Sequence, residues 1–292
     1  MASLQAIHDT SRTLLMGVLN ITEDSFSDGG LWLDPAKARE HGLSMLHDGA
    51  DIIDIGAEST RPGAKRVSEA DELARITGAV EALIGGDDVT LSIDTTRALV
   101  AAAALDKGAQ IINDVSGGTL DKELPHVVAD HDCLYIVQHW RGWLTGSKGD
   151  VPDVDTSIYE HGVLRDVRDE LMRQVDDVIA AGVKPERIII DPGLGFSKPG
   201  IEHNMPLLAG LEQFEDTGYP VLIGQSRKRF ISAMLNDSGI SEPTMDDRDN
   251  VTAALSALCA EHGAWAVRVH DVARSRAAVI AGMQWRSAAR QG

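Results

Sequence analysis

The chain has 292 residues, 43% of them hydrophobic and 25% charged, and a formal net charge of -18 at pH 7. Such a composition is typical of a soluble globular protein with a sizeable core. The acidic charge argues against nucleic acid or an anionic membrane surface as the main partner, because both are themselves negatively charged. It does not exclude an anionic substrate, because a local cationic pocket can still bind one.

Two features of the sequence bear on the cellular compartment. No segment approaches the ~20 consecutive apolar residues of a membrane span, and residues 1–13 contain no apolar run of the signal-peptide type. The two cysteines, Cys133 and Cys259, form neither a CxxC pair nor a zinc-binding spacing, so we expect two buried thiols. We therefore expect a cytoplasmic protein that binds neither membranes nor nucleic acid.

Short apolar segments alternate along the chain with longer amphipathic ones. We predict strands at residues 14–19, 51–56, 90–95, 111–115, 134–139, 188–192, 221–225 and 265–270. Each is followed by a predicted helix, at residues 35–48, 68–84, 97–107, 122–129, 157–181, 205–214, 229–235 and 273–283. An additional helix is predicted at residues 249–261, between the seventh and eighth units.

This alternation indicates the fold class. The strands are apolar throughout, which implies burial on both faces and hence a parallel sheet. Eight such units most simply close into a (β/α)₈ TIM barrel, and we expect one domain over residues 1–292 with its core at about 14–283. A doubly wound open sheet is the alternative, but no GxGxxG turn follows the first strand. Long connections after strands one, two and five, at residues 22–32, 57–67 and 141–156, are typical of functional loops.

Polar residues lie where the predicted strands end. They are Asn20, Asp54, Asp94, Asn113, Asp114, His139, Asp191, Ser226, Arg227, Lys228, Arg268 and His270. The carboxyl ends of barrel strands meet at one rim, so we expect these side chains to form a single polar pocket. Arg268 and His270 share a strand face and suit a phosphate or carboxylate, whereas Asp94, Asp191 and Asn113 suit a flat heterocycle. The residues alone therefore indicate a planar, nitrogen-rich, phosphorylated substrate without identifying it.

Seven motifs carry a resemblance to a known family. They are NITEDSFSDGG at 20–30, DIGAESTRPG at 54–63, SIDT at 92–95, GAQIINDVSGG at 108–118, DPGLG at 191–195, SRK at 226–228 and RVHDV at 268–272. In this order and spacing they resemble the dihydropteroate synthases, and the match covers about residues 14–282. The segments HWR at 139–141 and GAW at 263–265 are similar to the actinobacterial branch of that family.

The resemblance implies a reaction and a set of roles. It implies a transferase of folate biosynthesis, the target of sulfonamides, that joins 6-hydroxymethyl-7,8-dihydropterin pyrophosphate to p-aminobenzoate and forms 7,8-dihydropteroate and pyrophosphate. The catalytic residues implied are Asp28 on a mobile first loop, Asp94, Lys228 and Arg268, and the pterin would be bound by Asp94, Asn113, Asp191, Gly224, Lys228 and Arg268. Asn20, Arg268 and His270 would hold the pyrophosphate, with Asn20 near a Mg²⁺ ion, and Thr60, Arg61, Pro62 and Ser226 would bind p-aminobenzoate. The family also implies a homodimer formed through helices far from the site.

Two glutamines depart from the family pattern. Gln138 stands where the family usually has an apolar residue, and Gln225 replaces a small apolar one. If Gln138 faces the pterin, it either adds a hydrogen bond or spoils an apolar wall. If it faces outward, it needs a partner, because a buried unpaired amide costs ~1–3 kcal/mol. The same question applies to Gln225.

Two other functions remain as alternatives. A methyltetrahydrofolate methyltransferase would share the pterin acceptors but would need no pyrophosphate site, so the motifs at 226–228, 268–270 and 60–62 argue against it. A non-catalytic pterin-binding protein would bind the ring without turnover, and the residues do not exclude it.

Overall fold

The computed structural model describes residues 4–22, 34–58, 67–84, 89–142 and 155–290. Its strands are β1 (Leu14–Asn20), β2 (Ile52–Gly56), β3 (Thr90–Asp94), β4 (Ile111–Asp114), β5 (Leu134–Gln138), β6 (Ile188–Asp191), β7 (Leu222–Ile223) and β8 (Ala266–Val269). They form one parallel sheet in the order β6-β5-β4-β3-β2-β1-β8-β7. A parallel bridge between Ile190 and Val221 joins the two end strands and closes the ring. The predicted barrel is thus confirmed, and the open sheet is excluded.

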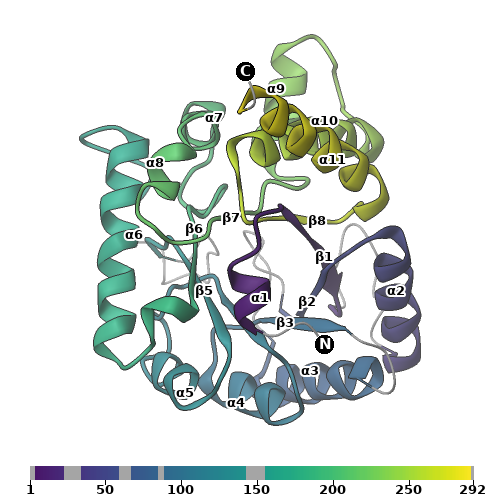
Figure 1. Ribbon diagram of the computed structural model, residues 1–292, viewed down its shortest axis with the longest axis vertical. Coiled ribbons are helices and arrows are strands. Elements are labelled where there is room, and N and C mark those ends of the chain that lie inside the picture. Colours follow the sequence, from purple (N-terminus) through teal and green to yellow (C-terminus); the bar gives the residue numbers. More distant parts are fainter. Residues whose placement is uncertain (1–3, 23–33, 59–66, 85–88, 143–154, 291–292) are drawn as a thin grey trace.

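Helices surround this ring of strands (Figure 1). They are α1 (Leu4–His8), α2 (Pro35–Asp48), α3 (Glu69–Ile84), α4 (Ala98–Asp106), α5 (Leu124–Asp130), α6 (Val163–Ala180), α7 (Ile201–Ala209), α8 (Glu212–Glu215), α9 (Arg229–Asp237), α10 (Met245–His262) and α11 (Val272–Ala289). The three longest strand-to-helix connections, at residues 21–34, 57–68 and 139–162, are the ones the sequence predicts. No helix among the described residues is long and apolar enough to cross a membrane.

The core has an inner and an outer part, and the strands alternate between them. Along β5, Leu134 and Ile136 belong to the cluster inside the barrel, whereas Tyr135 and Val137 belong to the cluster between strands and helices. This two-residue period is the normal pleat of a strand. It also fixes which residue at the end of each strand faces the barrel axis, and so which polar groups can reach a common pocket.

A short helix that the sequence analysis did not predict covers one end of the barrel. Ile7 of α1 packs among the residues that begin the strands, such as Leu14 and Leu222. The indole Nε1 of Trp265 donates a hydrogen bond to the Ile7 carbonyl at 2.9 Å. Figure 1 looks onto this end, with α1 in the middle of the ring. Because α1 closes the amino ends of the strands, ligands must enter from the opposite rim.

Two predicted helices differ from the structure. The helix expected at 157–181 begins only at Val163, because Ser157 turns back onto Asp155 and Gly162 adopts a φ of 92°. The helix expected at 205–214 starts earlier and divides into α7 and α8 at Gly210, whose amide bonds to the Pro206 carbonyl. Neither change moves a residue of the predicted pocket.

Candidate active site

A polar layer replaces the apolar interior at the carboxyl ends of the strands. In the register of the sheet, Asp54 lies opposite Ser92, and Asp94 lies opposite Asn113. All four continue the inward alternation set by Ile52 and its neighbours lower in the barrel. The side chains of β2, β3 and β4 therefore converge on one space above the inner core.

Arg268 of β8 joins this layer together. Its Nε donates to Asp54 Oδ2 at 2.6 Å, and its Nη2 donates to Asp94 Oδ2 at 2.8 Å. The same Asp54 oxygen accepts from Asn113 Nδ2 at 3.1 Å. Burial acts to lower the pKa of Arg268, but Asp54 and Asp94 raise it above its ordinary value, so the guanidinium stays charged.

The carboxyl group of Asp94 has a pKa well above its ordinary value. Burial raises its pKa to about 7, Arg268 opposes the shift, and the negative charge of Asp54 adds to it. A carboxyl group with this pKa exchanges its proton near neutral pH, which is a property of functional sites more than of structural ion pairs.

Asp191 and Lys228 form a second charged group on the other side of the barrel. A Cβ placed on Gly224 would lie 3.7 Å from Asp191 Oδ2 and 3.9 Å from Lys228 Nζ, so the missing side chain leaves space beside both. Lys228 Nζ also donates to the Leu194 carbonyl and lies 4.8 Å from the Phe196 ring centroid. Burial lowers the pKa of Lys228 to about 8 against the attraction of Asp191, and burial raises the pKa of Asp191 against that of Lys228.

The segment 226–228 turns sharply so that its neighbours point in different directions. Arg227 has a φ of 59°, in the left-handed region that non-glycine residues seldom occupy. Its guanidinium forms a two-bonded ion pair with Asp249 of α10, at 2.7 and 2.8 Å. Arg227 is therefore anchored away from the polar layer, while Ser226 and Lys228 remain at the rim.

Ser226 pairs with His270. The serine Oγ lies 2.9 Å from His270 Nδ1 and accepts from the His270 backbone N–H at 3.2 Å. If the hydroxyl donates to Nδ1, the ring proton sits on Nε2 and can be donated to an anion; this tautomer is inferred from the bonding pattern. The ends of β7 and β8 thus place a hydroxyl and an imidazole side by side.

Three buried oxygens of the polar layer have no hydrogen-bond partner among the described residues. They are Asp54 Oδ1, Ser92 Oγ and Asn113 Oδ1. A buried polar atom left unpaired costs about 1–3 kcal/mol, so native structures rarely keep several together without a ligand or water. The layer therefore has unused capacity for hydrogen-bond donors.

Asn20 is the residue expected near a metal ion. It ends β1, where it lies opposite Gly56, and its side-chain amide forms no hydrogen bond with the part of the chain that the structure describes. No group of three or more His, Cys, Asp or Glu side chains among the described residues could hold a metal ion. Mg²⁺ often binds through one or two protein oxygens together with substrate phosphates and water. A single amide oxygen therefore fits an ion that arrives with its substrate.

The structure answers the question about the two glutamines. Gln138 continues the inward alternation of Ile136, lies opposite Asp191, and donates to the Val115 carbonyl at 3.2 Å. Gln225 points the other way, into the interface with α10, and donates to Ser256 Oγ at 2.7 Å. Gln138 thus belongs to the pocket wall, and Gln225 does not.

Some predicted site residues cannot be placed, and some placed residues were not predicted. Asp28, Thr60, Arg61 and Pro62 lie outside the described residues. The family motifs assign no role to Asp54 or Ser92, although both lie in the polar layer. Both follow the alternation within their strands, Asp54 with Ile52 and Ser92 with Asp94, and that alternation is the signal that could have found them.

Comparison with known proteins identifies the family. Residues 16–270 match the family of pterin binding enzymes. The chain is 47% identical over 261 residues to a dihydropteroate synthase of Mycobacterium leprae, with 89% of each chain covered. The chain belongs to the dihydropteroate synthase family. The actinobacterial resemblance expected from the sequence agrees with this relative.

Solved structures of the family have the same fold. A Yersinia pestis dihydropteroate synthase in a sulfonamide drug complex superposes with a TM-score of 0.85 at 34% identity, with 96% of each chain covered. A Xanthomonas albilineans dihydropteroate synthase with 4-aminobenzoic acid superposes with a TM-score of 0.81 at 35% identity, covering 95% of this chain and 93% of the other. As a member of this family, the chain is a transferase of folate synthesis.

Proposed function

We propose that this chain joins 6-hydroxymethyl-7,8-dihydropterin pyrophosphate to p-aminobenzoate through the polar layer at the carboxyl rim of the barrel. The observation that carries the assignment of this site is the set of unpaired buried oxygens on Asp54, Ser92 and Asn113. A dihydropterin ring offers several N–H donors along one edge. Binding the ring would satisfy acceptors that the protein alone leaves unused.

We assign the pterin ring to the space between two charged groups, Arg268 with its carboxylate partners and Asp191 with Lys228. The proposed contacts are Asp94, Asn113, Asp191, Gly224, Lys228 and Arg268. The Nδ2 of Asn113 is already engaged by Asp54, so its Oδ1 is the atom available to a ligand. The absent side chain of Gly224 leaves room for a flat ring beside Asp191 and Lys228. The flat face of the Arg268 guanidinium would stack on the pterin ring, while its N–H groups keep their hydrogen bonds to Asp54 and Asp94.

The pyrophosphate is assigned to Asn20, Arg268 and His270. His270 is oriented by Ser226, and Arg268 supplies a fixed positive charge. When bound with the substrate, Mg²⁺ would neutralise part of the charge that develops on the leaving group, and Asn20 is its proposed protein ligand. The protein's own contribution is to hold the anion against two donors that are in place before the substrate arrives.

The p-aminobenzoate is assigned to Ser226 together with Thr60, Arg61 and Pro62. Only Ser226 lies among the described residues, at the rim beside His270. Asp28 of the first loop is assigned to closure over the site and, with Asp94, Lys228 and Arg268, to the catalytic group. Exclusion of water by the loops would protect the reactive intermediate.

The proposed order of bond changes is dissociative. The bond between the pterin methylene carbon and the pyrophosphate oxygen breaks first, and the oxygen keeps both electrons. The electron-rich ring then carries a cationic methylene, which the carboxylates of Asp94 and Asp191 stabilise. The amine of p-aminobenzoate attacks this carbon, and the released pyrophosphate takes up the proton that the amine loses. No covalent bond to the enzyme is needed. If pyrophosphate departure is never seen in the absence of p-aminobenzoate, this order is wrong.

Two variants test the assignment of the subsites. Asp191→Asn should raise the KM for the pterin substrate roughly 10- to 100-fold, because it loses a charge-assisted acceptor. Ser226→Ala should instead raise the KM for p-aminobenzoate roughly fivefold to tenfold. Steady-state kinetics with each substrate varied in turn would separate the two. Ser226→Ala can also weaken pyrophosphate binding through His270, so the assignment fails if Ser226→Ala leaves the KM for p-aminobenzoate unchanged or if Asp191→Asn raises it.

We further propose a cytoplasmic homodimer. The large apolar side chains exposed on α10 and α11 include Leu258 (56%), Ile280 (47%) and Trp285 (72%). These two helices pack against each other, since a Cβ on Gly282 would lie 2.1 Å from the Ala257 carbonyl oxygen. A second copy of the chain would cover this apolar face. The free, buried thiols of Cys133 and Cys259 suit a reducing compartment.

A further inference from the structure

A lysine outside the proposed binding residues is completely buried behind the pterin pocket. Lys198 lies in the connection between β6 and α7, and none of its surface is exposed. Its Nζ lies 2.9 Å from each of three acceptors, which are His139 Nδ1, the Gly193 carbonyl and the Phe196 carbonyl. Three acceptors match the three N–H donors of an ammonium group. The lysine therefore uses all three N–H donors to link His139 to the backbone of Gly193 and Phe196.

The segment that Lys198 holds turns sharply through left-handed backbone conformations. Gly193, Gly195 and Ser197 have φ values of 67°, 76° and 53°, all in the left-handed region. For a serine this conformation costs free energy, and it persists only where the surroundings over-determine it. Lys198 bonds to carbonyls on either side of the segment 194–195, and the Asn204 side chain accepts from the Gly195 amide at 2.7 Å. These bonds hold the turn in its unusual shape.

The braced segment in turn contacts both partners of the second charged group. The Gly193 amide donates to Asp191 Oδ1 at 2.7 Å. The Leu194 carbonyl accepts from Lys228 Nζ. The positions of the carboxylate and the ammonium therefore both depend on the backbone that Lys198 holds.

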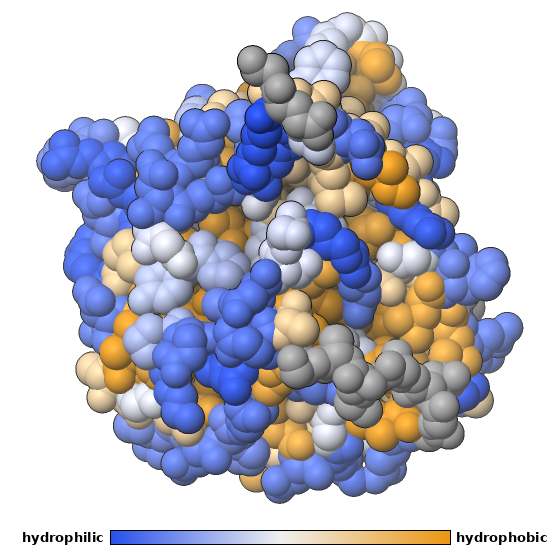
Figure 2. Space-filling view, in the orientation of Figure 1, coloured by the Kyte–Doolittle hydropathy of each residue, from blue (hydrophilic) through white to orange (hydrophobic). Residues whose placement is uncertain are grey.

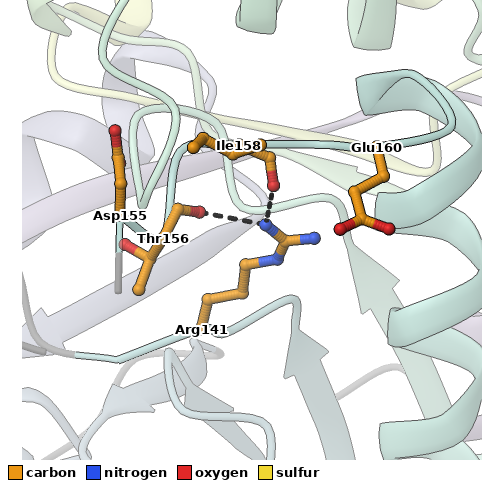
Figure 3. A pocket seen from close by; sticks show the side chains of 5 residues that line it. All are labelled: Arg141, Asp155, Thr156, Ile158 and Glu160. Carbon is orange, nitrogen blue, oxygen red and sulfur yellow. Dashed lines mark hydrogen bonds between the residues drawn. The ribbon is translucent and has the colours of Figure 1, made fainter. Parts of the chain in front are cut away.

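A chain of polar contacts supports the lysine from the outside. His139 accepts from Lys198 at Nδ1, so its Nε2 carries the proton and donates to Glu170 Oε2 at 2.9 Å. Arg141 bonds both Glu170 oxygens, at 2.6 and 2.7 Å. Figure 3 shows the same guanidinium pointing at the carbonyls of Thr156 and Ile158, at 3.1 and 2.6 Å. Burial lowers the pKa of His139 to about 3, and the neighbouring Lys198 contributes to the same shift. The His139 ring therefore stays neutral.

We propose that Lys198 is a positioning residue for pterin binding, which acts by holding the segment 193–196 against Asp191 and Lys228. This inference rests on the proposed pterin site. The loss of Lys198 should therefore affect the pterin half of the site and leave the p-aminobenzoate half largely unchanged.

Lys198→Met tests the proposal, because methionine fills similar space without donors or charge. We expect the Kd for the pterin pyrophosphate, measured by calorimetry, to rise about tenfold or more. The KM for p-aminobenzoate should stay within about twofold. A merely structural role would lower Tm without raising the pterin Kd selectively.

Tyr135→Phe is the matched control. Tyr135 is equally buried, and its hydroxyl donates to Asp114 at 2.8 Å, without contacting the segment 193–196. It should lower Tm while leaving the pterin Kd unchanged. Should Lys198→Met fail to fold, Lys198→Gln keeps two N–H donors, and its pterin Kd should still exceed that of the wild type.

The inference is overturned if a folded Lys198 variant loses stability like Tyr135→Phe but binds the pterin pyrophosphate as tightly as the wild type. The inference would also be overturned if the Kd for the pterin pyrophosphate and the KM for p-aminobenzoate rose by the same factor. If the wild type itself does not bind the pterin pyrophosphate, the proposed function fails, and the inference fails with it.

Discussion

At the residue scale, the site depends on which face of a strand each polar side chain occupies. Gln138 and Gln225 both follow apolar strands, yet one lies in the pocket wall and the other under α10. The strands are buried on both faces, so the sequence shows no alternation between apolar and polar residues. Their end residues could be predicted to gather at one rim, but their facing could not. Asp54 and Ser92 could be assigned only by counting in steps of two from a neighbour of known facing, Ile52 for Asp54 and Asp94 for Ser92.

The two shifted ionisations predict a narrow pH optimum. The pKa of Asp94 is raised to about 7, so below that pH its carboxyl group is protonated and loses an acceptor. The pKa of Lys228 is lowered to about 8, so above that pH its ammonium loses its charge beside Asp191. The kcat/KM for the pterin substrate should therefore be bell-shaped, and a stopped assay across buffers of constant ionic strength would measure it. A flat profile from about pH 5.5 to about 9.5 would contradict this account.

At the element scale, the barrel separates stability from function along its axis. The amino ends of the strands hold apolar residues and α1, and the carboxyl ends hold the polar layer. Strand and helix order could be predicted from periodicity alone. The helix α1 could not, because five residues are too few to show a helical period, and its formation depends on packing against the barrel.

This separation predicts that damage to α1 lowers stability without changing catalysis. Ile7→Ala removes a buried side chain from the closed end of the barrel and should cost about 2–5 kcal/mol. Tm should fall by several degrees, and the KM for either substrate should change less than about twofold. Thermal melts and kinetics on the same preparation would measure both. Leu99→Ala, at a side chain 52% exposed on α4, is the control and should leave Tm unchanged. A rise in either KM for Ile7→Ala would show that the two ends are coupled.

At the scale of the whole molecule, most of the visible surface is hydrophilic, with hydrophobic residues in small groups (Figure 2). This agrees with the net charge of -18. Such a charge keeps copies of the chain apart unless a specific apolar face offsets the repulsion. The exposed side chains of α10 and α11 are the proposed face. The sequence could not indicate this face, because exposure of a helix residue depends on how the neighbouring helices pack.

The proposed dimer predicts a measurable mass. Sedimentation equilibrium should give about twice the chain mass of 31.3 kDa. Trp285→Glu should shift the equilibrium towards the single chain, because it places a charge in the proposed apolar contact. Leu99→Glu, on α4, should not. A wild-type protein that sediments as one chain at all concentrations tested would show that α10 and α11 are not an interface.

The polar layer at the carboxyl rim is the site at which we propose that dihydropteroate forms. The most direct test mixes the purified protein with 6-hydroxymethyl-7,8-dihydropterin pyrophosphate, p-aminobenzoate and Mg²⁺, and follows dihydropteroate and pyrophosphate together. We predict that both products form in equal amounts and that Asp94→Asn abolishes their formation while the protein remains folded. Tight binding of the pterin pyrophosphate by the wild type without either product would contradict the account and indicate a non-catalytic pterin-binding protein.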